Sequence, residues 1–152
     1  MKKRIMWIGF AITAIALIVF SVISAEIYYD NDIIYSQRYL RAYMAAFDDS
    51  RTADTLDEAY AKELSEALGG ARVTFLTAEG EYIADSEDGD EASRAMRPEV
   101  RDAIASGEGF DTRVSQTLGD TFIYYCRRFD GYLVRIAERT QSMWSIYLDA
   151  LP

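Results

Sequence analysis

The segment TFIYYCRRFDGYLVRIAER, residues 121–139, decides the fold class of this chain. Two runs rich in aromatic and β-branched residues, Thr121 to Phe129 and Tyr132 to Arg139, stand on either side of Asp130-Gly131. An Asp-Gly pair between two such runs is a strong signal for a tight β-hairpin. A similar run, Phe110 to Thr117, comes just before them. We therefore predict three consecutive antiparallel strands in this part of the chain.

Two more strands and a short helix are predicted upstream of these runs. Arg72 to Thr77 and Tyr82 to Ser86 are rich in strand-forming residues, and the turn Ala78-Glu79-Gly80-Glu81 joins them. Arg97-Pro98 opens a helix, because proline is favoured in the first helical turn. This helix carries Val100, Ala103 and Ile104 inward, and Gly107 and Gly109 stop it. Because the connections are short, we predict an α+β domain with a five-stranded antiparallel sheet and helices against one face.

Helical spacing dominates between residues 26 and 70. One helix is predicted from Glu26 to Phe47, because apolar residues recur there at helical positions, namely Tyr29, Ile33, Leu40, Met44 and Phe47. Thr55-Leu56-Asp57-Glu58 has the pattern of a capping box. It precedes a second apolar stripe, formed by Leu56, Tyr60, Leu64 and Leu68, and Gly69-Gly70 ends that helix.

The N-terminal segment has the length and composition of a membrane anchor. Ile5 to Ala25 is an uncharged run of 21 residues, and about 20 apolar residues cross a bilayer core as a helix. Lys2, Lys3 and Arg4 precede the run, so the positive-inside bias predicts a cytoplasmic N-terminus and an extracytoplasmic location for residues 26–152. The alternative is a signal peptide cleaved after Ala25, although the run is longer than a usual apolar core of such a peptide.

Composition excludes several function classes. The net charge is -9, and an acidic body repels phosphate backbones, so nucleic acid is not an expected partner. The chain contains no histidine, which removes histidine-dependent triads, histidine zinc sites and a phosphoaccepting histidine. Cys126 is the single cysteine, so an intramolecular disulfide cannot form. We expect no cofactor, no metal site and no enzymatic activity.

The order of several short motifs resembles that of a known family. After the anchor and the helical pair come Arg72-Val73-Thr74, Gly80, Ala84-Asp85-Ser86, Arg97-Pro98-Glu99-Val100, Gly107, Gly109, Arg113-Val114-Ser115-Gln116-Thr117 and Tyr124-Tyr125. Together these motifs resemble the extracytoplasmic input region of phosphate-regulon-type sensor histidine kinases of Gram-positive bacteria, a PAS-like or single Cache-like domain. The resemblance extends from the anchor to about residue 142.

The resemblance implies a role in two-component signal transduction. In such kinases the sensor domain lies between two membrane helices, and a HAMP linker, a dimerisation helix with the phosphoaccepting histidine and an ATP-binding domain follow. This chain ends where the second membrane helix would begin, so we expect a truncated input domain without kinase activity of its own. The alternatives are a stand-alone membrane-anchored domain that binds a ligand or protein partner, and a domain secreted after cleavage.

The sequence departs from the family pattern at one motif, and the resemblance also predicts how the chain is divided into parts. Family members often carry an Asn-His pair shortly before Arg-Pro-Glu, where this chain has Ser93-Arg94-Ala95-Met96. The expected parts are a basic cytoplasmic tip at 1–4, a transmembrane anchor at 5–25, juxtamembrane and domain helices at 26–70, a PAS-like sensory sheet domain at 71–139, and the start of a C-terminal signalling helix at 140–152.

Strand alternation brings arginines to one face of the predicted sheet. Asp111, Arg113, Ser115 and Thr117 share a face of one strand, and Leu133, Arg135, Ala137 and Arg139 share a face of another. Two arginines that face one cavity can hold a carboxylate or phosphate. The candidate ligand-binding residues are Arg113, Ser115, Thr117, Tyr124 and Arg135. The alternatives are ion pairs of the arginines with Asp85 or Asp111, or a place on the solvated face.

Other features have a functional and a structural interpretation. The stripe Tyr29, Ile33, Leu40, Met44 and Phe47 is the candidate homodimer and signalling surface, and its alternative is packing within one chain. The aromatic residues Phe122, Tyr124, Tyr125 and Tyr132 could line a pocket or pack in the sheet. Asp85 to Glu91 is acidic but lacks the spacing of a calcium-binding loop, so a solvated loop is expected. Cys126 is expected to be a buried apolar group.

Overall fold

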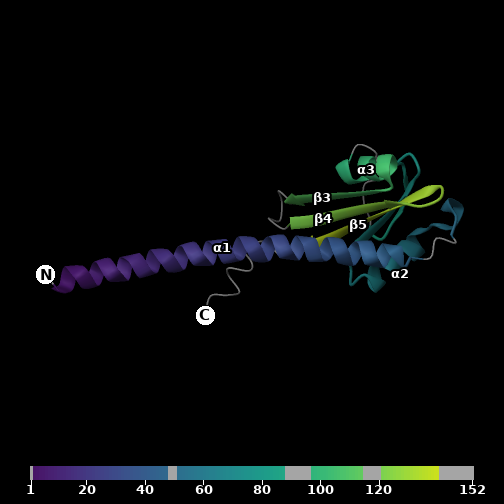
Figure 1. Ribbon diagram of the computed structural model, residues 1–152. Coiled ribbons are helices and arrows are strands. Elements are labelled where there is room, and N and C mark those ends of the chain that lie inside the picture. The colour runs from purple at the N-terminus through teal and green to yellow at the C-terminus, as the bar shows by residue number, and fades with distance from the viewer. Residues whose placement is uncertain (1, 48–50, 88–96, 115–120, 141–152) are drawn as a thin grey trace.

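A long helix and a five-stranded antiparallel sheet form the main architecture (Figure 1). The computed structural model describes residues 2–47, 51–87, 97–114 and 121–140. The elements are α1 (Lys2–Ala45), a 3-10 turn (Ala53–Thr55), α2 (Glu58–Ala67), β1 (Arg72–Thr77), β2 (Tyr82–Asp85), α3 (Pro98–Ser106), β3 (Glu108–Val114), β4 (Thr121–Arg128) and β5 (Tyr132–Thr140). The predicted α+β class is therefore confirmed.

The sheet has the strand order β2-β1-β5-β4-β3, and every neighbouring pair is antiparallel. Gly131, in the turn between β4 and β5, has a φ of 84°, and a positive φ is readily available only to glycine. This turn fixes the register in which Cys126 pairs with Arg135, and Arg135 pairs in turn with Thr74 of β1. The hairpins that the sequence predicts on either side of α3 are both present.

Helices cover both faces of the sheet, whereas the sequence predicted helices against one face only. In Figure 1 α3 lies on one side of the sheet, and α1 and α2 lie on the other. The physical reason is visible in β5, where the six residues from Tyr132 to Ala137 are all buried. A strand that is buried at successive positions has both of its faces covered.

The larger core lies between the sheet and the pair α1 and α2. Leu40 and Met44 of α1 are completely buried against sheet residues that include Phe75, Ile123 and Tyr125. The ring of Tyr60 in α2 stacks on Phe75, with 5.5 Å between the ring centroids. Because α1 supplies fully buried side chains, it is part of the folded domain.

The smaller core lies under α3. Val100 and Ala103 pack there on Leu76, Cys126 and Leu133. Gly109 of β3 lies so close to this helix that a Cβ atom at this position would clash with the backbone of Glu99. Gly109 is therefore a site of close helix-to-strand contact, and the prediction that it stops the helix is wrong. Gly107 ends α3 in the left-handed conformation, with a φ of 96°.

The start of α2 also differs from the prediction. Thr55 is not the helix cap, because residues Ala53–Thr55 form a 3-10 turn and the α-helix begins at Glu58. The N-cap is Asp57, whose carboxylate accepts a hydrogen bond of 2.8 Å from the backbone N–H of Tyr60. Aspartate is as good a cap as threonine, and the sequence pattern offered both within three residues.

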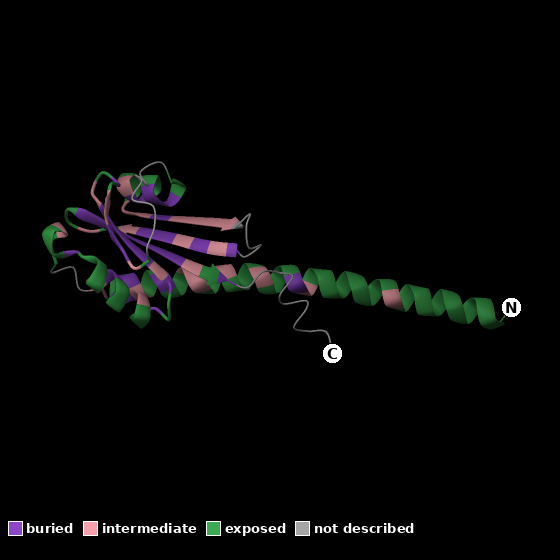
Figure 2. Cartoon of the chain, turned by 180° about the vertical axis from the view of Figure 1, so that it is seen from behind, coloured by how far each residue is buried: buried purple, intermediate pink, exposed green. Residues whose placement is uncertain are grey.

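The N-terminal half of α1 extends away from the sheet. Its most apolar window has a mean hydropathy of 2.5, and none of that window is buried in the chain. Figure 2 shows this part of the helix as exposed along almost its whole length. Among the described residues, α1 is the one helix that is long and apolar enough to cross a membrane. The predicted helix after Thr140 lies outside the described residues.

Candidate ligand-binding site

A completely buried carboxylate, that of Glu99, lies between α3 and the sheet. Glu99 follows Pro98 in the first turn of α3, and its neighbour Val100 and the residue one turn later, Ala103, anchor the same side of the helix to the sheet. A buried charge is costly unless it is paired and hydrogen-bonded. The sheet supplies the partners for this one.

Two arginines from different strands hold this carboxylate. Arg113 of β3 donates from Nη2 to both carboxylate oxygens of Glu99, each at 2.7 Å. Arg135 of β5 donates from Nε to Oε1 at 2.8 Å. The side chain of Arg113 is 30% exposed and that of Arg135 is 7% exposed. The cluster therefore has one arginine in the interior and one at its edge.

Tyr124 of β4 lies between the two arginines. The guanidinium carbon of Arg113 is 4.0 Å from the centroid of this ring, and that of Arg135 is 4.6 Å from it. The register explains the arrangement, because Tyr124 pairs with Asp111 on β3 and with Ala137 on β5, two positions from each arginine. Such diagonal positions across a sheet are within reach of long side chains, and contact with a ring face stabilises the cations.

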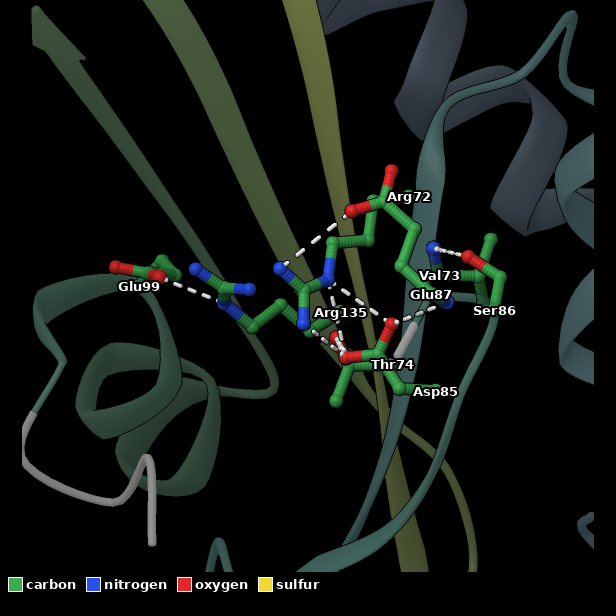
Figure 3. Close-up of polar contacts among 8 residues, drawn as sticks. All are labelled: Arg72, Val73, Thr74, Asp85, Ser86, Glu87, Glu99 and Arg135. Carbon is green, nitrogen blue, oxygen red and sulfur yellow. Dashed lines mark hydrogen bonds and ion pairs between the residues drawn. The ribbon is translucent and has the colours of Figure 1, made fainter. Parts of the chain in front are cut away.

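A second polar cluster lies beside the first on the same face of the sheet (Figure 3). Arg72 donates from Nε and Nη2 to Asp85 at 2.9–3.1 Å, and the hydroxyl of Thr74 donates to the same carboxylate at 2.9 Å. The hydrogen bond to Asp85 raises the pKa of Arg72, although burial opposes it. In Figure 3 the side chains of Arg72 and Arg135 extend to separate carboxylates. The register places Thr74 directly opposite Arg135.

The structure brings together three of the five predicted ligand-binding residues, Arg113, Tyr124 and Arg135. The predicted Ser115 and Thr117 lie outside the described residues. Of the predicted ion pairs, Arg113 does contact Asp111, with 2.6 Å between Nε and Oδ2. Asp85 pairs with Arg72 instead, because Asp85 lies directly opposite Thr74 on the β1-β2 hairpin, and Arg72 is two positions from Thr74 on the same face.

The sequence analysis missed Glu99, the group on which both arginines converge. A signal for it was present, because Glu99 is adjacent to Val100 and four positions before Ala103, which places it on the inward side of a helix. The aromatic residues divide between the two faces of the sheet. Tyr125 and Tyr132 are buried in the core with α1 and α2, and so they do not line a site with Tyr124.

The predicted dimer stripe of α1 faces the sheet of its own chain. Leu40 and Met44 are buried in the core, and Ile33 and Phe47 pack against it. The hydroxyl of Tyr29 lies 3.4 Å from the hydroxyl oxygen of Thr121. For these positions the structure corresponds to the alternative interpretation, packing within one chain. The physical reason is that the sheet needs an apolar cover on this face, and α1 provides it.

The remaining candidate groups have structural surroundings. Cys126 is completely buried, and burial raises the pKa of its thiol to about 12. Asp85, the first residue of the predicted acidic loop, is buried, and residues 88–91 lie outside the described part. Within the described ranges, no group of three or more histidine, cysteine, aspartate or glutamate side chains could hold a metal ion.

Two hollows lie along α1, one where it meets α2 and one where it also meets the C-terminal end of β5. One of about 310 Å³ is lined by aromatic and small residues that include Tyr43, Phe47 and Tyr60. Another of about 470 Å³ is lined by residues that include Tyr35, Tyr39 and Glu138. Both lie on the side of the sheet away from the arginine cluster, because α1 and α3 cover opposite faces.

Comparison with known proteins gives likenesses of fold. No protein-family model matches this chain, and no curated protein matches it. The chain is similar to the extracellular domain of a protein described as the histidine kinase rpHK1S-Z16, with 16% identity, coverage of 62% of this chain and 40% of that chain, and a TM-score of 0.44. It is also similar to the Bacillus subtilis YkuI protein, which has an EAL domain and was solved with c-di-GMP and calcium. That match has 18% identity, coverage of 79% of this chain and 34% of that chain, and a TM-score of 0.48. The chain thus spans less than half the length of either.

Proposed function

We propose that this chain is the membrane-anchored, extracytoplasmic sensory domain of a two-component sensor histidine kinase, with a PAS-like sheet as its sensing part. The observation that carries the proposal is the continuity of α1. One helix, Lys2–Ala45, contains both the apolar segment and the completely buried core residues Leu40 and Met44. An anchor and a sensing domain that share one helix are mechanically joined.

The dimensions of α1 favour transmission along it. Fifteen residues separate Ala25, at the end of the apolar segment, from Leu40 in the core, a distance of about 22 Å along a helix at 1.5 Å per residue. Leu40 and Met44 are fixed by close packing, and packed interfaces change between discrete arrangements more readily than they deform. A change in the sheet would therefore reach the membrane as a shift or rotation of α1.

The last described strand supports the same proposal. Thr140, at the end of β5, donates a hydrogen bond of 2.6 Å to Asp32 of α1. Asp32 is only two turns of helix beyond Ala25. The chain thus enters and leaves the sheet at the end that faces the apolar segment, which is the arrangement a domain needs if two membrane helices are to flank it.

The proposed homodimer contact must use a surface that the sheet leaves free. Tyr28, Tyr35 and Tyr39 of α1 are 70%, 72% and 42% exposed, and Ala42 is exposed as well. These four positions recur at intervals of seven, four and three residues, and so they share one side of the helix. We propose this tyrosine stripe, in place of the buried one, as the contact between two copies of α1.

Cysteine chemistry in intact cells tests the anchor and its orientation. Buried Cys126 is not expected to react, so the natural chain serves as an unlabelled background. A membrane-impermeant maleimide should label an exposed Glu63→Cys variant in intact cells, and it should label Lys2→Cys only after the cells are broken. Release of the labelled domain into the medium, or labelling of Lys2→Cys in intact cells, would contradict the proposal.

Crosslinking and a chimera test the signalling part. Disulfide dimers should form in membranes with Tyr35→Cys or Ala42→Cys, and they should be scarce with Arg41→Cys, which lies on another side of the helix beside Glu108. Residues 1–140 should also be joined to the second membrane helix and kinase modules of a membrane histidine kinase. Gly109→Ala, which presses on α3, should change autophosphorylation of this chimera, whereas Gly9→Ala, which meets nothing, should not. Equal kinase activity in the unmodified chimera, in Gly109→Ala and in Gly9→Ala would favour a stand-alone binding protein.

A further inference from the structure

We propose that the hollow beside Glu138, on the α1 side of the sheet, binds a small organic amine in its ammonium form. This hollow has a volume of about 470 Å³ and is lined by residues of α1, β5 and the end of α2, among them Tyr35, Tyr39 and Glu138. Its size is typical of a pocket for a small molecule. It lies across the sheet from the arginine cluster, so the two sites are separate.

The hollow exists because β5 continues past the first residue of β1. Arg72 begins β1 and pairs with Ala137, so the register with β1 ends one residue before Glu138. On its other side Glu138 pairs with Ile123 of β4. Strand alternation turns Glu138 toward α1, as it does Ile136 of the larger core. The carboxylate therefore lies at an open corner between α1, β5 and the end of α2.

The carboxylate of Glu138 has no cation beside it in the described part of the chain. Its Oε2 atom is buried there without a hydrogen-bond partner, and none of the ion pairs among the described residues includes Glu138 or Asp32. Burial, and next the charge of Asp32, raise the pKa of Glu138, whereas a hydrogen bond with Ser36 lowers it. Two carboxylates in this position are stabilised by a cation that binds between α1 and β5.

The rest of the lining also favours a cation. The hollow borders the C-terminal end of α2, which carries the negative end of the helix dipole, and the last turn of α2 has no basic residue. The rings of Tyr35 and Tyr39 supply aromatic faces, which attract ammonium groups. None of the described lining residues is basic. A cation in the hollow therefore meets favourable charges or dipoles from three elements.

Hydrogen bonding selects an amine among the possible cations. A primary ammonium group carries three N–H donors, as the lysine side chain does, and an alkylamine of this kind is charged at neutral pH. A quaternary ammonium ion has no donor for a carboxylate oxygen. A metal ion requires several oxygen ligands, and the described residues contain no group of three or more acidic, histidine or cysteine side chains that could hold one.

Calorimetric titration of the full chain tests the proposal, in nanodiscs of zwitterionic lipid that hold one copy each. One copy per nanodisc leaves Tyr35 and Tyr39 uncovered by a second α1. The probe is putrescine, a diamine, with tetramethylammonium and magnesium chloride as comparisons at constant pH and ionic strength. Putrescine should bind measurably, and tetramethylammonium should bind at least about tenfold more weakly, because it cannot donate a hydrogen bond to Glu138.

Charge variants locate the binding. Glu138→Gln should weaken putrescine binding by about tenfold or more, because the ion pair is lost. Glu58→Gln is the matched control, since it removes the same charge from an exposed position at the other end of α2, about 14 Å along the helix from Ala67. Tyr39→Leu keeps the test decisive if Glu138→Gln does not fold. It removes an aromatic face and should weaken binding about two- to fivefold.

Several results would overturn the amine site. They are absence of putrescine binding to the folded chain, equal binding by Glu138→Gln, equal affinity for tetramethylammonium, and displacement of putrescine by an equal concentration of magnesium. A loss in Glu58→Gln as large as that in Glu138→Gln would also overturn it, because the amine would then respond only to the net charge of the chain.

The amine site and the sensory function can fail separately. None of the titration results would alter the labelling, crosslinking and chimera experiments, on which the sensory function depends. Conversely, failure of the chimera together with intact putrescine binding would leave an amine-binding domain that does not signal through a kinase.

Discussion

Truncation of Leu40 tests whether α1 is part of the folded domain. Leu40 is completely buried between α1 and the sheet, and Met44, one turn further, is 1% exposed. Replacement of a buried leucine by alanine loses the transfer free energy of the side chain and leaves a cavity, at a total cost of about 2–5 kcal/mol. The expected loss for Leu40→Ala is at the upper half of this range, because the packing of a long rigid helix on a sheet relaxes little around a cavity.

Tyr35→Ala is the matched control for this prediction. Tyr35 belongs to the same helix but is 72% exposed, and surface substitutions of this kind usually change stability by less than about 0.5 kcal/mol. The whole domain is expected to have a free energy of unfolding of about 5–15 kcal/mol. Leu40→Ala should therefore remove a large share of the stability, while Tyr35→Ala should leave it almost unchanged.

Pulse proteolysis over a series of urea concentrations measures the effect directly. The full chain is placed in nanodiscs that hold one copy each, so that the proposed dimer contact at Tyr35 does not contribute to the midpoint. The midpoint for Leu40→Ala should fall well below that of the unmodified chain, and the midpoint for Tyr35→Ala should coincide with it. Equal midpoints for Leu40→Ala and the unmodified chain would refute the reasoning, because α1 would then contribute nothing to the domain. A large loss with Tyr35→Ala alone would mean that the opposite side of the helix is the packed one.

Three more predictions concern single groups. Gly109→Ala should cost about 1–3 kcal/mol, because its Cβ collides with the backbone of Glu99, and an unchanged urea midpoint would show that α3 does not lie this close. Burial, and next the charge of Asp32, raise the pKa of Glu138. Folding therefore favours the protonated carboxyl group of Glu138. The stability that this provides is fully present below the pKa of Glu138 in the unfolded chain, and it is lost as the pH rises through the pKa in the folded chain. The urea midpoint of the unmodified chain should fall over that pH range, and the fall should be smaller in Glu138→Gln. An equally steep fall in Glu138→Gln would exclude Glu138 as the cause. Cys126 should resist maleimide until urea unfolds the chain, because burial raises its pKa to about 12, and mass spectrometry of the folded chain would detect an early adduct.

Local sequence signals were sufficient to predict the strands, and also the helix ends at which glycine adopts a positive φ. The strands β4 and β5 follow from aromatic and β-branched runs on either side of Asp130-Gly131, and Gly131 does have the positive φ that such a turn needs. The same alternation placed Arg113 and Arg135 on one face. These features depend on neighbours within a few residues, which is why a sequence pattern contains them.

Features that depend on tertiary contacts were not available from the pattern. The stripe with Leu40 and Met44 shows that one side of α1 is apolar, but the same stripe suits a sheet or a second helix equally well. Glu99 was overlooked because acidic residues are seldom fully buried, and its burial follows from two arginines that arrive from strands distant in sequence. The role of Gly109 likewise depends on how closely α3 approaches β3.

The alternation of β4 joins the candidate ligand site to the candidate signalling helix. Tyr124 lies under the two arginines on the α3 side of the sheet, whereas its neighbours Ile123 and Tyr125 are completely buried on the side of α1. Because backbone dihedrals of adjacent residues cannot move independently in a hydrogen-bonded strand, a displacement of Tyr124 must shift Ile123 and Tyr125 against the packed side chains of α1. Mutations at Tyr124 should therefore alter crosslinking along the tyrosine stripe even though α1 lies across the sheet, and an unaltered crosslinking pattern would show that the two faces act independently.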